Sequence, residues 1–332
     1  MTGLGTTPFL TAAMLRQGAA LRSGIDRASL ELTTGVAADT AAALRGDFSA
    51  LAGIDHSLAR ISAYAAATAE TGLLAEAAQT AMATISGQSD ELAGRLLQSI
   101  GSASGRAVSL AISTGAQAFT VAVNAINAQV SGRSIFGGIE VDTLPLPDAD
   151  TLLDRLAPVV AGATGAEAAM TAIADWFNDA AGYGDQYRGG PARSAGPVAE
   201  GESAQFAVTA LDPALSGTLA GLAAVALLDR GLLASNPDAR IDLARRAGEA
   251  LISSSDARVE LRSEIGVVQA RIADATSRNA AEKTALGIAR LALVEADPYE
   301  TAVRLQDLQT RLDAFYILTS RLSSLSLTEY LR

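Results

Sequence analysis

The chain has 332 residues, with 25 Lys and Arg against 36 Asp and Glu, a net charge of −11, one His and no Cys. The absence of Cys excludes disulfides and thiolate chemistry, and one His cannot build the multi-imidazole sites of most zinc and non-haem iron enzymes, so we expect no metal site. An acidic chain also lacks the clustered Lys and Arg that bind nucleic acid.

A first helix is predicted over about residues 7–34. Hydrophobic residues make up 49% of the chain and aromatic residues only 4%, so Ala supplies much of the apolar content and favours helices. Gly35 is placed to end this helix in the left-handed conformation. The segment before it lacks the basic and apolar regions of a cleaved signal peptide. One face of the helix forms a seam at steps of four and three: Met14, Gly18, Leu21, Ile25, Ala28 and Leu32.

Two further helical seams follow. The first begins at Leu51 and Ile54 and, after a phase slip, runs on to Leu92 and Leu96. A break is expected near Gly101. The next seam is Leu110, Thr114, Ala118, Val121 and Ala125. Together these seams predict an antiparallel helical pair.

The middle of the chain, from about residue 131 to 233, has a different character. Heptads disappear, and most of the nine Pro residues lie here. Alternation over residues 205–209 predicts a strand, and helical patches are expected over 151–181 and 213–229. The most apolar stretch, residues 219–228, is too short to span a bilayer, so we expect no membrane insertion.

Heptads return in the C-terminal part. The seam there contains Leu261, Ile265, Val268, Ile272 and Ala275. Asp297 is predicted to cap the last helix, with Pro298 in its first turn and Glu300 reaching back as in a capping box. The seam of that last helix is Leu305, Leu308, Leu312, Phe315, Thr319 and Leu322.

The composition and seams predict a mainly α fold: an elongated antiparallel helical coiled-coil rod built from both termini, with a small α+β or β insert in the middle. The internal seams suit a bundle within one chain. Narrow seams on the two terminal helices need partners, because such helices are marginal alone. We expect them to pack against each other and, above all, against identical chains. The expected segments are 1–35, 36–138, 139–233, 234–296 and 297–332.

Three stretches resemble the flagellin family. Asn127, Gly132, Arg133, Phe136 and Gly138 fit the signature Asn-x-x-x-x-Gly-Arg-x-x-Phe-x-Gly of flagellin-family axial proteins. The turn after the first predicted helix, at Gly35, resembles the family's Leu-Ser-Thr-Gly turn. The run from Glu295 to Leu331 is similar to the end of the hook-associated branch, which joins the flagellar hook to the filament.

The resemblance implies a structural subunit of the bacterial flagellum that joins hook to filament by helix-driven self-assembly. It further implies secretion through the flagellar type III export system, an export chaperone bound to the C-terminal helix, and a neighbouring hook-associated protein and flagellin as partners. Filament flagellin itself is one alternative. A surface or glycan-binding adhesin that acts through the insert is another.

No pattern in the sequence predicts catalysis or a cofactor. His56 has no accompanying Ser or Cys motif, so a solvated surface position is expected. Lys283 is the only Lys and lies outside any phosphate-binding loop. The acidic residues around Asp175 and Asp179 lack the spacing of an EF-hand calcium loop. We therefore expect a protein that is not an enzyme.

Overall fold

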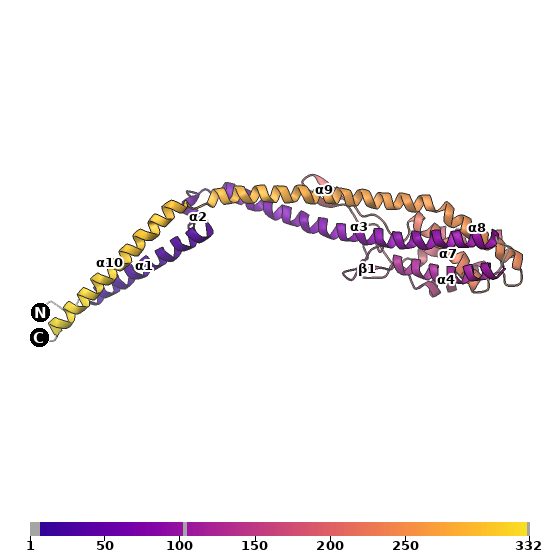
Figure 1. The fold of residues 1–332 in the computed structure, drawn as a ribbon, viewed down its shortest axis with the longest axis horizontal. Coiled ribbons are helices and arrows are strands. Elements are labelled where there is room, and N and C mark those ends of the chain that lie inside the picture. Colours follow the sequence, from indigo (N-terminus) through magenta and orange to yellow (C-terminus); the bar gives the residue numbers. More distant parts are fainter. Residues whose placement is uncertain (1–6, 102–104, 331–332) are drawn as a thin grey trace. The chain divides into compact units, whose positions relative to one another are not determined.

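The computed structural model describes the backbone of residues 7–101 and 105–330, and the side chains of residues 12–101 and 105–321 (Figure 1). The helices are α1 (Thr7–Thr34), α2 (Thr40–Ala43), α3 (Ser49–Gly101), α4 (Gly105–Ile126), α5 (Ala149–Val160), α6 (Ala166–Asn178), α7 (Pro213–Asp229), α8 (Pro237–Ser253), α9 (Ser255–Val294) and α10 (Pro298–Tyr330). A turn of π-helix, η1 (Ala180–Gly184), follows α6. Two antiparallel hairpins pair β1 (Gln129–Val130) with β2 (Arg133–Ser134), and β3 (Gly196–Ala199) with β4 (Glu202–Ala204). The predicted class, mainly helical with a small insert, is confirmed.

Contacts between Cα atoms divide the chain into two compact units. Unit 1 comprises residues 1–61 and 280–332, and unit 2 comprises residues 62–279. The predicted segments 1–35 and 297–332 belong to unit 1, 139–233 belongs to unit 2, and 36–138 and 234–296 contribute to both. That these segments are separate domains stays a prediction.

In unit 1, α1 and α10 lie side by side and run antiparallel (Figure 1). Gly18 faces the Phe315 ring, and a Cβ atom added to it would lie 3.1 Å from Cε1 of that ring. Gly24 faces Leu308, where the corresponding distance to Cδ1 is 3.2 Å. These distances are at the short limit of Cβ contacts, so glycine is what lets the two helices approach so closely.

The backbone that leaves α1 is bound to the backbone that leads into α10. Gly35 ends α1 with φ = 70°, as predicted. The Ala37 N–H donates to the Val294 carbonyl (2.8 Å), and the Ala296 N–H donates to the Gly35 carbonyl (3.0 Å). These bonds fix the ends of α1 and α9 to each other.

The start of α10 has the predicted cap. Asp297 accepts hydrogen bonds from the backbone N–H groups of Tyr299 (2.8 Å) and Glu300 (3.1 Å), and Pro298 is the first helical residue. The predicted capping box is not completed, because the Glu300 carboxylate instead accepts from Arg304 (2.9 Å).

The core of unit 2 surrounds α7. Of its 17 residues, 14 are buried, and α4, α5, α6 and α8 all pack against it. Asp212 caps its N-terminus by accepting from the Ala214 N–H (2.9 Å), and burial raises the pKa of that carboxyl. Because α7 is apolar all round, it can only be stable inside such a core. The predicted insert thus supplies the centre of unit 2.

A buried cation joins three parts of unit 2. The Arg258 side chain is 1% exposed and forms an ion pair with Asp90 of α3. Its guanidinium also donates to the Leu251 carbonyl (3.1 Å) and to the hydroxyls of Ser254 (2.7 Å) and Thr218 (3.5 Å). Arg258 therefore fixes the break between α8 and α9 against α3 and α7.

The solvent-facing side of α4 differs from the prediction. Within the predicted seam, Leu110 is 68% exposed and Val121 is 37% exposed, whereas Ala118 is buried beside Phe119 and Val123. The seam was misplaced because no charged residue marks which side of this helix meets water.

By length and composition α4 is also apolar enough to cross a membrane, but it packs in unit 2 against α7 and 44% of that span is buried.

Two predictions within the middle of the chain were wrong in detail. Residues 205–209 form no strand, and the strands lie just before them, at β3 and β4. That hairpin packs on α9, where Val198 is buried with Ile272 and the Asn279 amide donates to the Val198 carbonyl (2.7 Å). The helical patch at 151–181 is two helices, because Gly162 and Gly165 separate α5 from α6.

An acid-sensitive ion-pair cluster on α8 makes a testable contribution to stability. Hydrogen bonds from Arg246 and then Arg245 lower the pKa of Asp242 below its ordinary value of 3.8. The carboxylate therefore stabilises the fold fully above pH 3.8, and this contribution is lost as pH falls through the lowered pKa of the folded state. We expect Asp242→Asn to flatten the loss of stability between about pH 5 and pH 2, measured by urea unfolding. Identical slopes for the variant and the parent would contradict this.

Candidate assembly surfaces

The predicted seam of α1 and α10 lies mostly where these helices face each other in unit 1. Leu21 is buried, while Leu32 is 42% exposed. Leu322 lies outside the residues whose side chains are described. The half-buried members of the seam are Met14, Ile25, Leu305, Leu308, Leu312 and Phe315. The seam thus has a partner within the chain, and its packing between chains stays a prediction.

Polar contacts set the register of α1 on α10. Arg22 donates to the Tyr316 hydroxyl from Nη2 (2.6 Å) and Nε (3.0 Å). Arg304 pairs with Glu31 (3.4 Å), whose carboxylate is 10% exposed and also accepts from the Ala38 N–H (2.9 Å). Two charge-assisted contacts, placed at different heights along the helices, disfavour sliding of one helix past the other.

A second apolar stripe on α10 was not identified from the sequence. Val303 is 51% exposed and Ile317 is 57% exposed, and each lies two positions before or after an inward-facing residue, Leu305 or Phe315. Two positions correspond to about 200° around an α-helix, so these side chains point away from α1. We define the outer stripe as Tyr299, Val303, Ile317 and Leu318, all exposed. Its spacing of 14 residues between Val303 and Ile317, two heptads, is the signal that could have revealed it.

Charge is distributed unevenly between the two units. Unit 1 contains 11 basic and 12 acidic residues, and unit 2 contains 14 basic and 24 acidic residues. Nearly all of the net negative charge therefore belongs to unit 2. Like charge opposes close packing of copies, so the nearly neutral unit 1 is the part better suited to it.

The first half of the motif at Asn127 closes a loop. The Asn127 amide donates to the Leu146 carbonyl (3.0 Å), and its carbonyl oxygen accepts from the Leu146 N–H (2.9 Å). Between β1 and β2, Ser131 and Gly132 both have positive φ, 53° and 75°, which is the geometry of a tight hairpin turn. Arg133 extends from β2 to form an ion pair with Glu70 of α3.

The second half of the motif is enclosed by a glycine-rich segment that sequence analysis did not connect to it. Phe136 is fully buried. Gly138 has φ = 62°, and a Cβ atom there would lie 2.3 Å from the carbonyl oxygens of Gly190 and Pro191. The Arg193 guanidinium donates to the Gly138 carbonyl (2.9 Å), and burial lowers the pKa of Arg193. The motif is therefore a structural junction that connects α4, β2 and residues 187–193.

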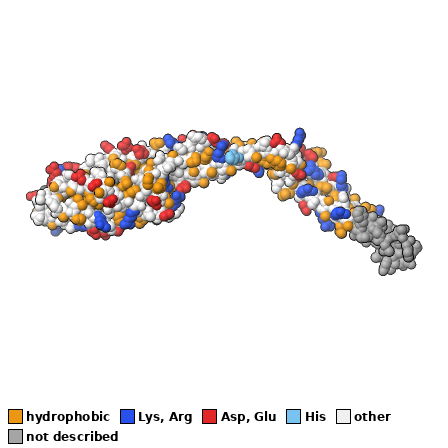
Figure 2. Space-filling model, turned by 180° about the vertical axis from the view of Figure 1, so that it is seen from behind, with side chains coloured by type: hydrophobic (Ala, Val, Ile, Leu, Met, Phe, Trp, Pro, Cys, Tyr) orange, Lys and Arg blue, Asp and Glu red, His pale blue; other side chains and the backbone are white. Residues whose placement is uncertain are grey.

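The structure does not bring together the residues that were considered for catalysis or metal binding. His56, the single His, lies at the surface (Figure 2). Asp175 and Asp179 are exposed, and Asp179 accepts from the Ala181 N–H (3.0 Å) at the start of η1. Within the described residues, no group of three or more His, Cys, Asp or Glu side chains is placed to hold a metal ion.

Comparison with known proteins finds a family match in the C-terminal part of the chain. Residues 254–331 match the family of the bacterial flagellin C-terminal helical region. A Vibrio parahaemolyticus structure assigned as a flagellar hook-associated protein is similar with a TM-score of 0.50 and 15% identity, over 72% of this chain and 94% of that one. The crystal structure of Bacillus cereus FlgL is similar with a TM-score of 0.46 and 16% identity, over 71% and 100%. No curated protein sequence matches. The predicted resemblance to the flagellin family is confirmed over residues 254–331, which match the model of that family's C-terminal helical region.

Proposed function

We propose that this chain is a structural subunit of the bacterial flagellum, a hook-associated protein that joins the hook to the filament. The observation that carries the proposal is the flagellin match over residues 254–331, which covers α9 and α10. In unit 1, α10 of this region pairs along its length with α1 from the other end of the chain. Both ends of the chain therefore build the part proposed to assemble.

The proposed mechanism is association of unit 1 with copies and neighbours through helix faces. The seam holds α1 against α10, and the outer stripe meets a neighbouring subunit. Burying apolar surface contributes about 25 cal/mol per Å². Because unit 1 is nearly neutral, repulsion between like charges offsets little of the free energy gained by this burial. The role is structural, and the part played by each residue is positioning and packing.

The resemblance to the flagellin family supports a proposal for the partners and for the route to the flagellum. The proposed neighbours are identical subunits, another hook-associated protein and flagellin. We place the protein outside the cell after type III export, with a chaperone on α10 beforehand. A chain without Cys forms no disulfide, which suits passage through a narrow export channel.

The test is a deletion strain. We expect hooks to be present, filament subunits to be released into the medium, and no filament to be attached. Complementation with the full chain should restore attachment. Counting copies of the chain per flagellum distinguishes this role from that of filament flagellin. A junction protein forms one short ring of few copies, whereas a filament contains many copies. Intact attached filaments in the deletion strain would refute the proposal.

The outer stripe gives a point mutation that separates assembly from folding. Val303→Asp places a charge at an exposed site, so we expect the unfolding free energy of the isolated chain to change by less than about 0.5 kcal/mol. In the complemented strain it should nevertheless abolish filament attachment, because the carboxylate would be buried without a partner. Gln309→Asp, at an exposed site off the stripe, is the matched control and should support attachment. Normal attachment with Val303→Asp would exclude the outer stripe as a contact.

A further inference from the structure

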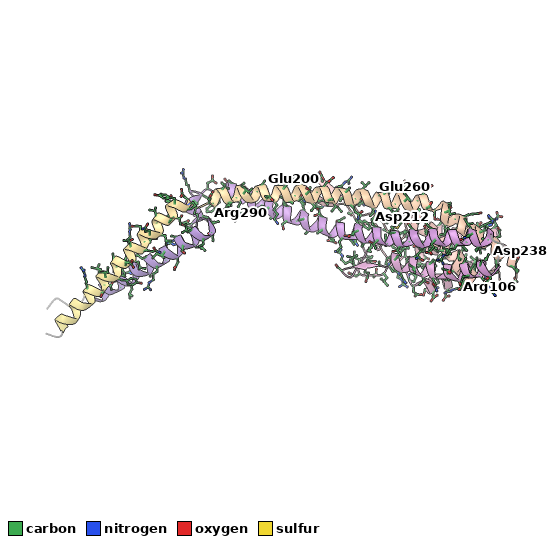
Figure 3. The ribbon with its side chains drawn as sticks, in the orientation of Figure 1. Arg106, Glu200, Asp212, Asp238, Glu260 and Arg290 are labelled. Atoms are coloured by element: carbon green, nitrogen blue, oxygen red, sulfur yellow. The ribbon has the colours of Figure 1, made fainter. Side chains whose placement is uncertain are left out.

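The exposed side of α4 is unusual for a helix on an acidic unit. Residues 107–132 contain no charged residue, and the single charged residue of α4, Arg106, lies at its first turn (Figure 3). A helix that faces water normally carries charge on that side. We define the neutral face as the exposed side chains Leu110, Ser113, Gln117, Val121 and Asn124. Depletion of charge is typical of the core of protein interfaces.

The neutral face borders a groove between α4 and α3. One hollow of about 630 Å³ is lined mainly by apolar side chains, among them Leu73 of α3, Val121 of α4 and Ile135 after the β1–β2 hairpin, and by the carboxylate of Glu76. A second hollow, of about 330 Å³, lies farther along the same two helices and includes Leu110 and Arg95. Leu73 is 47% exposed beside the first hollow. The groove therefore offers apolar walls and space for side chains from a partner.

A complementary stripe lies on α9. Val259 is 65% exposed and Val267 is 58% exposed, and each lies two positions from a buried residue, Leu261 or Ile265. These valines thus point away from the core of unit 2. Ser263 and Ala270 lie on the same side, and we call these four residues the α9 stripe. In unit 2, α9 and α4 lie on opposite sides of α3 (Figure 1).

The groove and the α9 stripe also lie at the same height along α3. Thr80 of α3 lines the larger hollow together with Val121. The neighbouring Gln79 donates to the Arg262 carbonyl of α9 (2.6 Å), and Gly72 contacts Ile272, with 3.4 Å between a Cβ atom added to Gly72 and Cγ2 of Ile272. Val267 lies between these two contacts in the sequence. A second copy placed alongside, with its axis parallel, would bring its α9 stripe to the groove.

We infer that the groove between α3 and α4 binds the α9 stripe of a second copy of this chain. The inference rests on the proposed function and adds a contact in unit 2 to those of unit 1. Charge permits this occupant, because the neutral face adds no carboxylate of its own and Glu76 is the one charged residue among those that line the larger hollow. Surfaces on opposite sides of a unit make a head-to-tail contact, which extends into rings or filaments rather than closing as a dimer.

The absence of Cys makes cross-linking a direct test. The full chain carrying both Val121→Cys and Val267→Cys replaces the parent in the deletion strain, and isolated organelles are treated with a short thiol-specific cross-linker. We expect a ladder of cross-linked oligomers. Each single-Cys variant is the control and should give no oligomers. Dimers from Val121→Cys alone would overturn the inference in favour of contact between two neutral faces.

A charge variant measures the contribution of the contact. Gln117→Glu should leave the melting temperature of the isolated chain unchanged and reduce its amount in organelles about tenfold, because a buried carboxylate would lack a partner. Thr171→Glu, an exposed site on α6, is the control and should incorporate normally. If the double-Cys variant is present in organelles but gives no ladder, only the contact is refuted. If the parent chain is absent from organelles, the proposed function and the contact both fail.

Discussion

Replacing Asp90 by Ala is expected to lower the free energy of unfolding by about 3 kcal/mol or more, because it leaves a buried charge without its counter-ion. Asp90 is itself 62% exposed, so its own burial does not suggest such an effect. Its partner Arg258 is 1% exposed, and water cannot take the place of the carboxylate there. Urea unfolding of the full chain, followed by circular dichroism, measures the change.

The adjacent residue provides a matched control for this prediction. Glu91 forms an ion pair with Arg95 in which both side chains are more than half exposed, so Glu91→Ala should cost less than about 1 kcal/mol. Arg258→Met combined with Asp90→Ala should recover part of the loss, since no buried charge then remains. Equal effects of the Asp90 and Glu91 substitutions would show that burial of Arg258 does not matter.

Replacing Gly138 by Ala is expected to destabilise unit 2 by about 3 kcal/mol or more, the sum of a strained backbone and an overlap. With φ = 62°, an L-residue is disfavoured at this position. The added Cβ would also lie 2.3 Å from two carbonyl oxygens, of Gly190 and Pro191. Backbone atoms cannot rotate aside as a flexible side chain does, so the junction at residues 187–193 must open.

A substitution at Gly132 separates the cost of the strained backbone from the cost of the atomic overlap. It also has positive φ, 75°, but a Cβ atom there would meet nothing within 4 Å. Gly132→Ala should therefore show only the conformational cost, about 1 kcal/mol. Thermal unfolding of both variants, with hydrogen exchange at residues 187–193, provides the comparison. Similar losses for the two variants would mean that close packing at Gly138 contributes little.

The two motif glycines illustrate what a resemblance to a family can and cannot provide. The sequence placed Gly132 and Gly138 in one signature, and both have the left-handed conformation. Their surroundings differ because Gly138 is enclosed by a segment about fifty residues later in the chain, held by Arg193 and Tyr187. Sequence spacing does not show that this later segment packs against Gly138, so neither Arg193 nor Tyr187 was connected to the motif.

Helix periodicity predicted best where one side of a helix is clearly apolar and the other clearly charged. In α10, Phe315 and Leu308 of the predicted seam face Gly18 and Gly24 of α1, and exposed charged residues such as Asp307 border the seam. In α4 the same method failed, because Leu110 and Val121 are as apolar as the buried Val108 and Ile112. Contacts with α7, α5 and α8 distinguish the two sides.

The sequence by itself determined the helical class, both ends of α1, the start of α10, the family signature and the seams on the terminal helices, because capping chemistry and periodicity are local properties of the chain. The tertiary structure decided which elements meet. It paired α1 with α10, placed α7 of the insert at the centre of unit 2, and buried Arg258 against Asp90 of α3. These arrangements depend on contacts between residues far apart in the chain, for which no local pattern encodes the partner.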